Sequence, residues 1–154
     1  MSSADTTIHD SPESTYDLGR QMASTLTGGE VILLYGGLGA GKTLLTKGIM
    51  DGLGYDVDEV TSPSFALVNL YQTKHFDVYH IDLWRLEPPV DVISAVGLEE
   101  ILEDEDAVLI IEWADRLTTS PMQRPVLSVT ITGSGNEPRV IEIGRDSFST
   151  HQNN

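Results

Sequence analysis

Apolar residues recur along the chain with two different periods, which predicts a domain that mixes helices and strands. Residues 11–13 (Ser-Pro-Glu) are typical of a helix start, with a capping hydroxyl, proline at the first helical position and an acid in the first turn. Apolar positions then follow at helical spacing as far as Gly28-Gly29, where we expect this helix to end. These positions are Leu18, Met22 and Leu26. Residues 31–35 form a continuous apolar run between turn signals, which favours a buried strand of a parallel sheet.

The remaining pattern predicts an α/β domain with a mixed sheet. Residues 42–50 read as a helix that ends at Gly52 and Gly54, and short helices are expected at 90–95 and 98–102. Further strands are expected at 65–71, 76–84, 107–111, 125–131 and 140–143. The last two surround a turn and predict a C-terminal β-hairpin. We expect one domain over residues 11–145, a disordered N-terminal arm over 1–10 and a tail over 146–154.

A glycine-rich segment lies between the predicted strand at 31–35 and the predicted helix at 42–50. Residues 36–43 read Gly-Gly-Leu-Gly-Ala-Gly-Lys-Thr and match G-x-x-x-x-G-K-[ST]. Glycines allow a tight turn whose N–H groups face phosphate oxygens, and the helix that follows adds its positive end. The pattern predicts a P-loop NTPase-like fold in which Lys42 bridges phosphates and Thr43 binds Mg2+. The predicted phosphate-binding residues are Gly37, Leu38, Gly39, Ala40, Gly41, Lys42 and Thr43.

Two acidic residues are candidates for the carboxylate that such a loop requires near Mg2+. Glu112 ends an apolar strand, at the sheet edge where open α/β sheets bind ligands. Asp82 shares a strand face with His80 and Trp84 by alternation. Without further information, Asp82 is equally readable as a solvated strand carboxylate, and Glu112 as a strand-end ion pair. No clustering of Cys, His and acids has transition-metal spacing, so a structural or orienting role is expected for His80.

Composition narrows the functional classes. The 154 residues carry a formal net charge of −15 and three lysines, so autonomous nucleic-acid binding is disfavoured. The chain has no cysteine, which excludes disulfides and a thiol nucleophile. No apolar run reaches the roughly 20 residues of a membrane span. The polar, acidic first ten residues do not resemble a secretory signal, so a cytoplasmic location is expected.

Residues 61–64 (Thr-Ser-Pro-Ser) lie between the predicted phosphate-loop helix and the next strand, where nucleotide switches place a loop that senses the γ-phosphate. Thr61 is therefore a candidate nucleotide-binding residue, although a plain Ser/Thr-Pro turn is an equally good interpretation. No Asn-Lys-x-Asp occurs, which argues against a GTPase.

Taken together, these motifs resemble the bacterial TsaE (YjeE) family of tRNA threonylcarbamoyladenosine biosynthesis. The resemblance runs from about Ser11 to about Gly144 and is carried by four segments in the same order. These are residues 34–43, 61–65, 80–85 and 111–113. The chain departs from the family pattern at Ser64, where Thr is usual, and at Trp84, where Tyr is usual, so a hydrogen bond from that phenol is not carried over.

The resemblance implies an ATPase that uses ATP/ADP and Mg2+. Lys42, Asp82 and Glu112 would be catalytic, and Thr43, Glu112 and Asp82 would serve the metal. Trp113 would support the active site or the partner contact. The implied partners are the TsaD and TsaB proteins, which modify the adenosine beside the anticodon, so tRNA would be reached indirectly. The ATPase would reset that complex between turnovers.

Three functions follow from these patterns. The first is an ATP hydrolase, weak alone and stimulated by partners, in which Glu112 orients water and Arg85 is a secondary candidate for charge neutralisation. The second is a small-molecule kinase, which the scattered arginines disfavour, since such kinases use a lid with several arginines. The third is an ATP-gated adaptor without useful hydrolysis.

Overall fold

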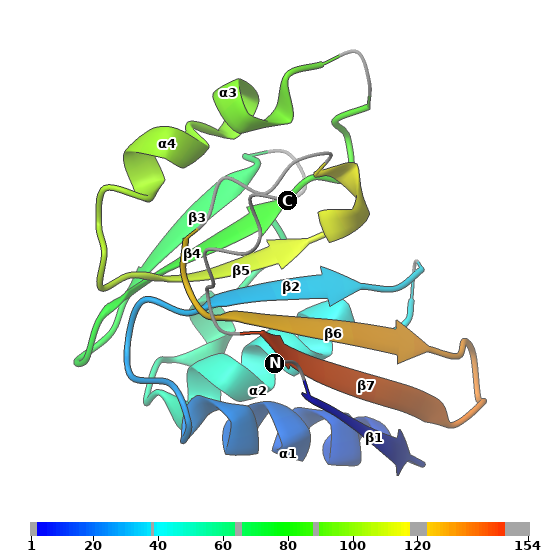
Figure 1. Ribbon diagram of the computed structural model, residues 1–154. Helices are drawn as coiled ribbons and strands as arrows, with labels where there is room; N and C mark the ends of the chain where they lie inside the picture. The colour runs from blue at the N-terminus through cyan, green and yellow to red at the C-terminus, as the bar shows by residue number, and fades with distance from the viewer. Residues whose placement is uncertain (1–2, 38, 64–65, 88–89, 118–122, 147–154) are drawn as a thin grey trace.

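The structure is a computed structural model that describes residues 3–37, 39–63, 66–87, 90–117 and 123–146. A seven-stranded sheet in the order β1-β7-β6-β2-β5-β4-β3 carries helices on both faces (Figure 1). Its strands are β1 (Ser3–His9), β2 (Val31–Tyr35), β3 (Val68–Gln72), β4 (Asp77–Asp82), β5 (Val108–Glu112), β6 (Val126–Thr132) and β7 (Arg139–Asp146). The helices are α1 (Pro12–Ala23), α2 (Lys42–Gly52), α3 (Val92–Val96) and α4 (Leu98–Ile101), with short 3-10 turns η1 (Val57–Glu59) and η2 (Ala114–Arg116).

The centre of the sheet is parallel and its edges are antiparallel. Strand β2 pairs in parallel with both β5 and β6, and β4 pairs in parallel with β5. All five residues of β5 are buried, as expected for a strand covered on both faces. Strands β6 and β7 form the predicted C-terminal hairpin, and β3 pairs antiparallel with β4. The mixed α/β sheet predicted from the sequence is confirmed.

The expectation of a disordered N-terminal arm is wrong. Residues Ser3–His9 form β1, which pairs with β7 along its whole length from Ser3 opposite Arg145 to His9 opposite Arg139. An ion pair of 3.5 Å joins Asp5 to Arg145. The strand is at the sheet edge and most of its described side chains are exposed, so it lacks the apolar run that marks a buried strand. The domain therefore begins before residue 11, while residues 147–154 of the predicted tail lie outside the described part.

Helix α1 starts where the sequence predicted and ends earlier. Ser11 caps it, since the Ser11 hydroxyl oxygen accepts a hydrogen bond of 3.2 Å from the Ser14 amide. The helix stops at Ala23 rather than at Gly28. The hydroxyls of Ser24 and Thr25 bond back to carbonyl oxygens of the last turn, and these local bonds compete with continuation of the helix.

Helices α1 and α2 cover one face of the sheet and touch through glycines. A Cβ built at Gly48 of α2 would lie 2.1 Å from the carbonyl oxygen of Tyr16, and one at Gly19 of α1 would lie 2.5 Å from the carbonyl oxygen of Leu45. The two backbones can approach this closely only because neither position has a side chain. This contact fixes α2, whose first residue is Lys42, against the sheet.

The opposite face is covered by α3 and α4, together with the loops around them (Figure 1). Val92, Leu98 and Ile101 pack there against Leu109 and Ile111 of β5. Within the described residues, no helix combines the length and apolar character needed to cross a membrane.

Candidate functional site

The phosphate-loop segment connects β2 to α2 at the carboxyl edge of the parallel strands, as predicted. Gly41 has φ 117 and is the N-cap of α2, so a side chain there would be strained. A Cβ at Gly37 or Gly39 would meet no atom within 4 Å other than those of its chain neighbours, so the space beside the loop at these two positions is open. The loop is closed by a hydrogen bond of 3.2 Å from the Ala40 amide to the Gly37 carbonyl oxygen.

A cavity of about 290 Å³ lies beside this loop and contains most of the predicted site. Of the predicted residues, Gly39, Gly41, Lys42, Thr43, Asp82, Glu112 and Trp113 line it, together with Leu44, Ser62 and Trp84. Gly37, Ala40 and Thr61 do not line this cavity, and Leu38 lies outside the described residues, as does Ser64. Sequence segments far apart thus converge on one space at the end of the sheet.

Lys42 is buried against the loop that precedes it. Its ammonium donates hydrogen bonds to the carbonyl oxygens of Gly36 at 2.7 Å and Gly37 at 2.8 Å. The same nitrogen lies 4.4 Å from the ring centre of Trp113, within cation–π range. Burial lowers the pKa of the Lys42 ammonium, and nearby carboxylates, foremost that of Glu112, oppose this shift. The ammonium is therefore confined between the loop carbonyl oxygens and the Trp113 ring. Phosphate oxygens could replace the carbonyl oxygens as its hydrogen-bond acceptors.

Trp113 covers the cavity in an unusual backbone conformation. Its φ of 58 and ψ of 44 are left-handed, which is costly for a bulky residue and is found where surrounding structure enforces it. This turn directs the indole over Lys42 and within 4.6 Å of the Trp84 ring, measured between centroids. The two indoles form one wall of the cavity.

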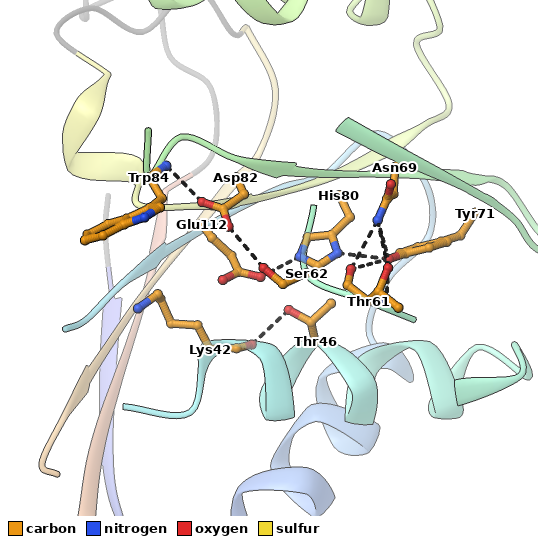
Figure 2. A network of polar contacts seen from close by, with 10 residues as sticks. All are labelled: Lys42, Thr46, Thr61, Ser62, Asn69, Tyr71, His80, Asp82, Trp84 and Glu112. Carbon is orange, nitrogen blue, oxygen red and sulfur yellow. Dashed lines mark hydrogen bonds and ion pairs between the residues drawn. The ribbon is translucent and has the colours of Figure 1, made fainter. Parts of the chain in front are cut away.

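The two predicted acids are adjacent, because β4 and β5 place Asp82 opposite Glu112. Both residues are buried, each with 3% of its surface exposed. Asp82 Oδ1 accepts a hydrogen bond of 2.9 Å from the Trp84 amide, and Oδ2 accepts one of 3.1 Å from the Ser62 hydroxyl. Glu112 Oε2 lies 2.5 Å from His80 Nε2. Figure 2 shows both acids facing the Lys42 side of the site.

A second cavity of about 280 Å³ lies on the other side of the phosphate loop. Its walls come from the start of α1, the loop itself and the β6–β7 turn, including Ser11, Thr15, Gly39, Ala40, Asn136 and Arg139. Arg139 joins two of these walls, since its guanidinium donates to the carbonyl oxygens of Ala40 at 2.9 Å and Gly39 at 3.2 Å. The two cavities therefore share the loop residues Gly39 and Gly41.

Comparison with known proteins decides the family. The sequence profile of the family described as "Threonylcarbamoyl adenosine biosynthesis protein TsaE" matches residues 9–141. The chain belongs to the TsaE family. This family takes part in the biosynthesis of threonylcarbamoyladenosine in tRNA.

Individual relatives support the assignment to this family. A protein of Nostoc sp. named tRNA threonylcarbamoyladenosine biosynthesis protein TsaE is 44% identical over 112 residues, covering 71% of this chain and 67% of the relative. The protein of that name from Rickettsia bellii is 32% identical over 137 residues, covering 89% and 92%. The crystal structure of Bacillus subtilus YdiB superposes with a TM-score of 0.74 at 26% identity, covering 98% of this chain and 90% of the other.

Two contacts at the site could not be predicted from the sequence. The sequence predicts a structural or orienting role for His80, and alternation places it on the same strand face as Asp82. Its contact with Glu112 follows from the pairing of β4 with β5, which the sequence does not show. Arg139 reaches the phosphate loop from the start of β7, and nothing in the local pattern indicates so distant a contact.

Proposed function

We propose that this TsaE-family chain binds Mg-ATP at the phosphate loop and hydrolyses it in support of tRNA threonylcarbamoyladenosine formation. The observation that carries the proposal is the convergence of Lys42, Thr43, Asp82 and Glu112 on one cavity at the carboxyl edge of the parallel strands. A cation, a hydroxyl at a helix start and two carboxylates are the groups that phosphoryl chemistry requires.

The loop supports triphosphate binding. Gly37 and Gly39 carry no side chains and the space beside them is open, so backbone N–H groups can approach phosphate oxygens closely. Lys42 would exchange its bonds to the Gly36 and Gly37 carbonyl oxygens for bonds to phosphate oxygens. The second cavity would hold the nucleoside, because it adjoins the same loop and has polar and apolar walls.

The donor set also fits a magnesium ion. Thr43 supplies a hydroxyl, and Asp82 and Glu112 supply carboxylate oxygens around the same cavity. No group of three or more His, Cys, Asp or Glu able to hold a metal occurs among the described residues, and Mg2+ bound to ATP needs none, because phosphates and water complete its shell. When bound, the ion neutralises charge on the phosphate oxygens.

Within this arrangement, Glu112 would orient the attacking water. His80 occupies Oε2, and no hydrogen bond from another described residue reaches Oε1, which leaves that oxygen available to a water. Lys42 would neutralise charge that develops on the γ-phosphoryl group. No arginine is among the described residues that line the cavity, so a partner is expected to complete the site. Arg85 stays a secondary candidate.

The proposed partners are the TsaD and TsaB proteins, with tRNA reached through them. The formal net charge of −15 supports this indirect route, because direct binding to a phosphate backbone requires clustered cations. ATP turnover would then reset the modifying complex.

The test combines calorimetry with turnover. ATP binding in Mg2+ is measured for the parent chain, Lys42→Ala and Glu112→Gln, and phosphate release is measured with and without TsaD and TsaB. We expect Lys42→Ala to lose binding, and Glu112→Gln to bind within a few-fold of the parent but to lose turnover. Normal ATP binding by Lys42→Ala would refute the phosphate-loop assignment. Binding without partner-stimulated phosphate release would favour the adaptor, and release that depends on a metabolite acceptor would favour the kinase.

A further inference from the structure

A buried hydrogen-bonded chain connects Glu112 to the segment Thr61–Ser62. His80 is fully buried, with 0% of its surface exposed, and its Nε2 lies 2.5 Å from Glu112 Oε2. Its other ring nitrogen, Nδ1, lies 3.1 Å from the hydroxyl of Tyr71. Figure 2 shows the imidazole between the carboxylate and the phenol. His80 thus has one partner on each nitrogen and no contact with solvent.

The phenol of Tyr71 ends this chain at Thr61. The hydroxyl accepts a hydrogen bond of 3.3 Å from the Thr61 amide and donates one of 3.0 Å to the Thr61 carbonyl oxygen. The Asn69 amide nitrogen lies 3.1 Å from the same carbonyl and 3.4 Å from the Thr61 hydroxyl. Strands β3 and β4 position these groups, because their register sets Asn69 opposite His80.

The protons of this chain follow from the Thr61 carbonyl oxygen, which can only accept. The Tyr71 hydroxyl donates its single proton to that carbonyl, to which Asn69 also donates. The phenol oxygen is then left to accept from the Nδ1–H of His80. Burial raises the pKa of the Tyr71 phenol, so it keeps its proton. The imidazole is thereby held in one orientation, with Nε2 directed at Glu112 Oε2.

The same segment also reaches the other acid. The Ser62 hydroxyl donates a hydrogen bond of 3.1 Å to Asp82 Oδ2. Adjacent residues of one segment are therefore linked to both carboxylates. Ser62 is linked by a direct hydrogen bond to Asp82, and Thr61 is linked to Glu112 through Tyr71 and His80. Thr61 and Ser62 are themselves exposed, between buried Val60 and Pro63.

We propose that Tyr71 and His80 are positioning residues that hold Glu112 in its water-orienting conformation only while Thr61–Ser62 lies against β3 and β4. Withdrawal of the segment removes the carbonyl oxygen to which Tyr71 donates, so the phenol proton can turn toward His80 Nδ1 and the imidazole no longer has a fixed tautomer or orientation. The position of the Thr61–Ser62 segment, rather than occupancy of the phosphate site, then decides whether Glu112 is oriented to hold the attacking water. This inference rests on the proposed ATPase function.

Tyr71→Phe tests the chain with the smallest change. It removes the hydroxyl that joins His80 to Thr61 and leaves Glu112, the cavity lining and the ring contacts in place. We expect the turnover number for ATP, with partners present, to fall about tenfold, as is usual when a partner that orients a site residue is lost. The dissociation constant for ATP should stay within about twofold, because the phenol does not line the nucleotide cavity.

Tyr55→Phe is the matched control. The Tyr55 ring lies 5.1 Å from that of Tyr71, centroid to centroid, and its hydroxyl has no hydrogen bond to another described residue. This variant removes the same hydroxyl oxygen from a neighbouring ring that does not belong to the hydrogen-bonded chain, so turnover should change by less than about twofold.

A double variant separates positioning from mere folding. If Tyr71 acts through His80, then Tyr71→Phe added to His80→Gln lowers the turnover number no further than His80→Gln alone, whereas independent effects multiply. Tyr71→Phe with full turnover and unchanged ATP binding would overturn this inference and leave the ATPase proposal standing. A parent chain that does not bind ATP would overturn the ATPase proposal itself.

Discussion

The contact between α1 and α2 yields a quantitative prediction at Gly48. A Cβ there would lie 2.1 Å from the Tyr16 carbonyl oxygen, whereas real Cβ contacts start near 3.0 Å. Gly48→Ala must therefore separate the helices by about 0.9 Å. The obstacle is backbone on both sides, with the Gly19 Cα a further 3.2 Å neighbour, so no side chain can rotate away.

The free energy of unfolding follows from two opposing terms. Forced overpacking costs about 3 kcal/mol at the upper end of the usual range, which applies where backbone rather than a flexible side chain must move. Replacing glycine by alanine inside a helix returns about 1 kcal/mol. We expect Gly48→Ala to lower the free energy of unfolding by about 2 kcal/mol, which corresponds to a fall in Tm of about 4–8 °C for a domain of this size.

The measurement is urea unfolding of the apo protein followed by circular dichroism, with ATP affinity measured on the same samples. Lys47→Ala is the control, because it changes a half-buried side chain one residue earlier on the same helix. It should shift the free energy of unfolding by less than about 0.5 kcal/mol. An unchanged or raised stability for Gly48→Ala would refute the close approach of α1 and α2. ATP affinity should weaken as well, since the displaced helix begins at Lys42.

Two further predictions concern the phosphate loop. Lys42→Met should abolish ATP binding yet raise the apo free energy of unfolding by up to about 1 kcal/mol, because a buried ammonium is replaced by an apolar chain. Burial lowers the pKa of Lys42, so the folded state binds fewer protons than the unfolded state between that pKa and 10.5. The parent protein therefore becomes more stable as pH rises through this window. The excess of the free energy of unfolding of Lys42→Met over that of the parent, measured by urea unfolding, should shrink; a growing excess would contradict the burial argument. Arg139→Ala should weaken ATP binding about fivefold in calorimetry by releasing the Gly39 and Ala40 carbonyls, at about 1 kcal/mol for the lost restraint. Arg145→Ala, on the same strand but paired with Asp5 at the exposed edge, should leave binding unchanged, and equal effects of the two would show that Arg139 has no special role.

The sequence was most informative where the physical cause is local. The phosphate loop needs glycines, a lysine and a hydroxyl within eight consecutive positions, and the strand that ends at Glu112 is an uninterrupted apolar run. Ser11 and the proline after it specify the start of α1 without reference to the rest of the chain. Such features are visible in the order of residues alone, and the structure confirms the elements they predicted.

Features that depend on residues far apart in the sequence could not be predicted from it. Strand β1 exists because β7 offers a free edge, and neither strand signals the other in its composition. The same holds for Arg139, whose target carbonyls lie about a hundred residues earlier in the chain. Sequence alternation placed His80 beside Asp82, but only strand register brings it to Glu112. The proposed roles of Thr61 and Trp113 in nucleotide binding stay predictions.

The adjacent indoles of Trp84 and Trp113 also have a practical consequence. The chain contains two tryptophans, and both line the cavity beside the phosphate loop. All of the intrinsic indole emission of the protein therefore originates within this one pocket, beside the ammonium of Lys42. Nucleotide arrival, metal exchange and docking of another protein over this wall can each be followed optically on unlabelled material, with no background from elsewhere in the molecule.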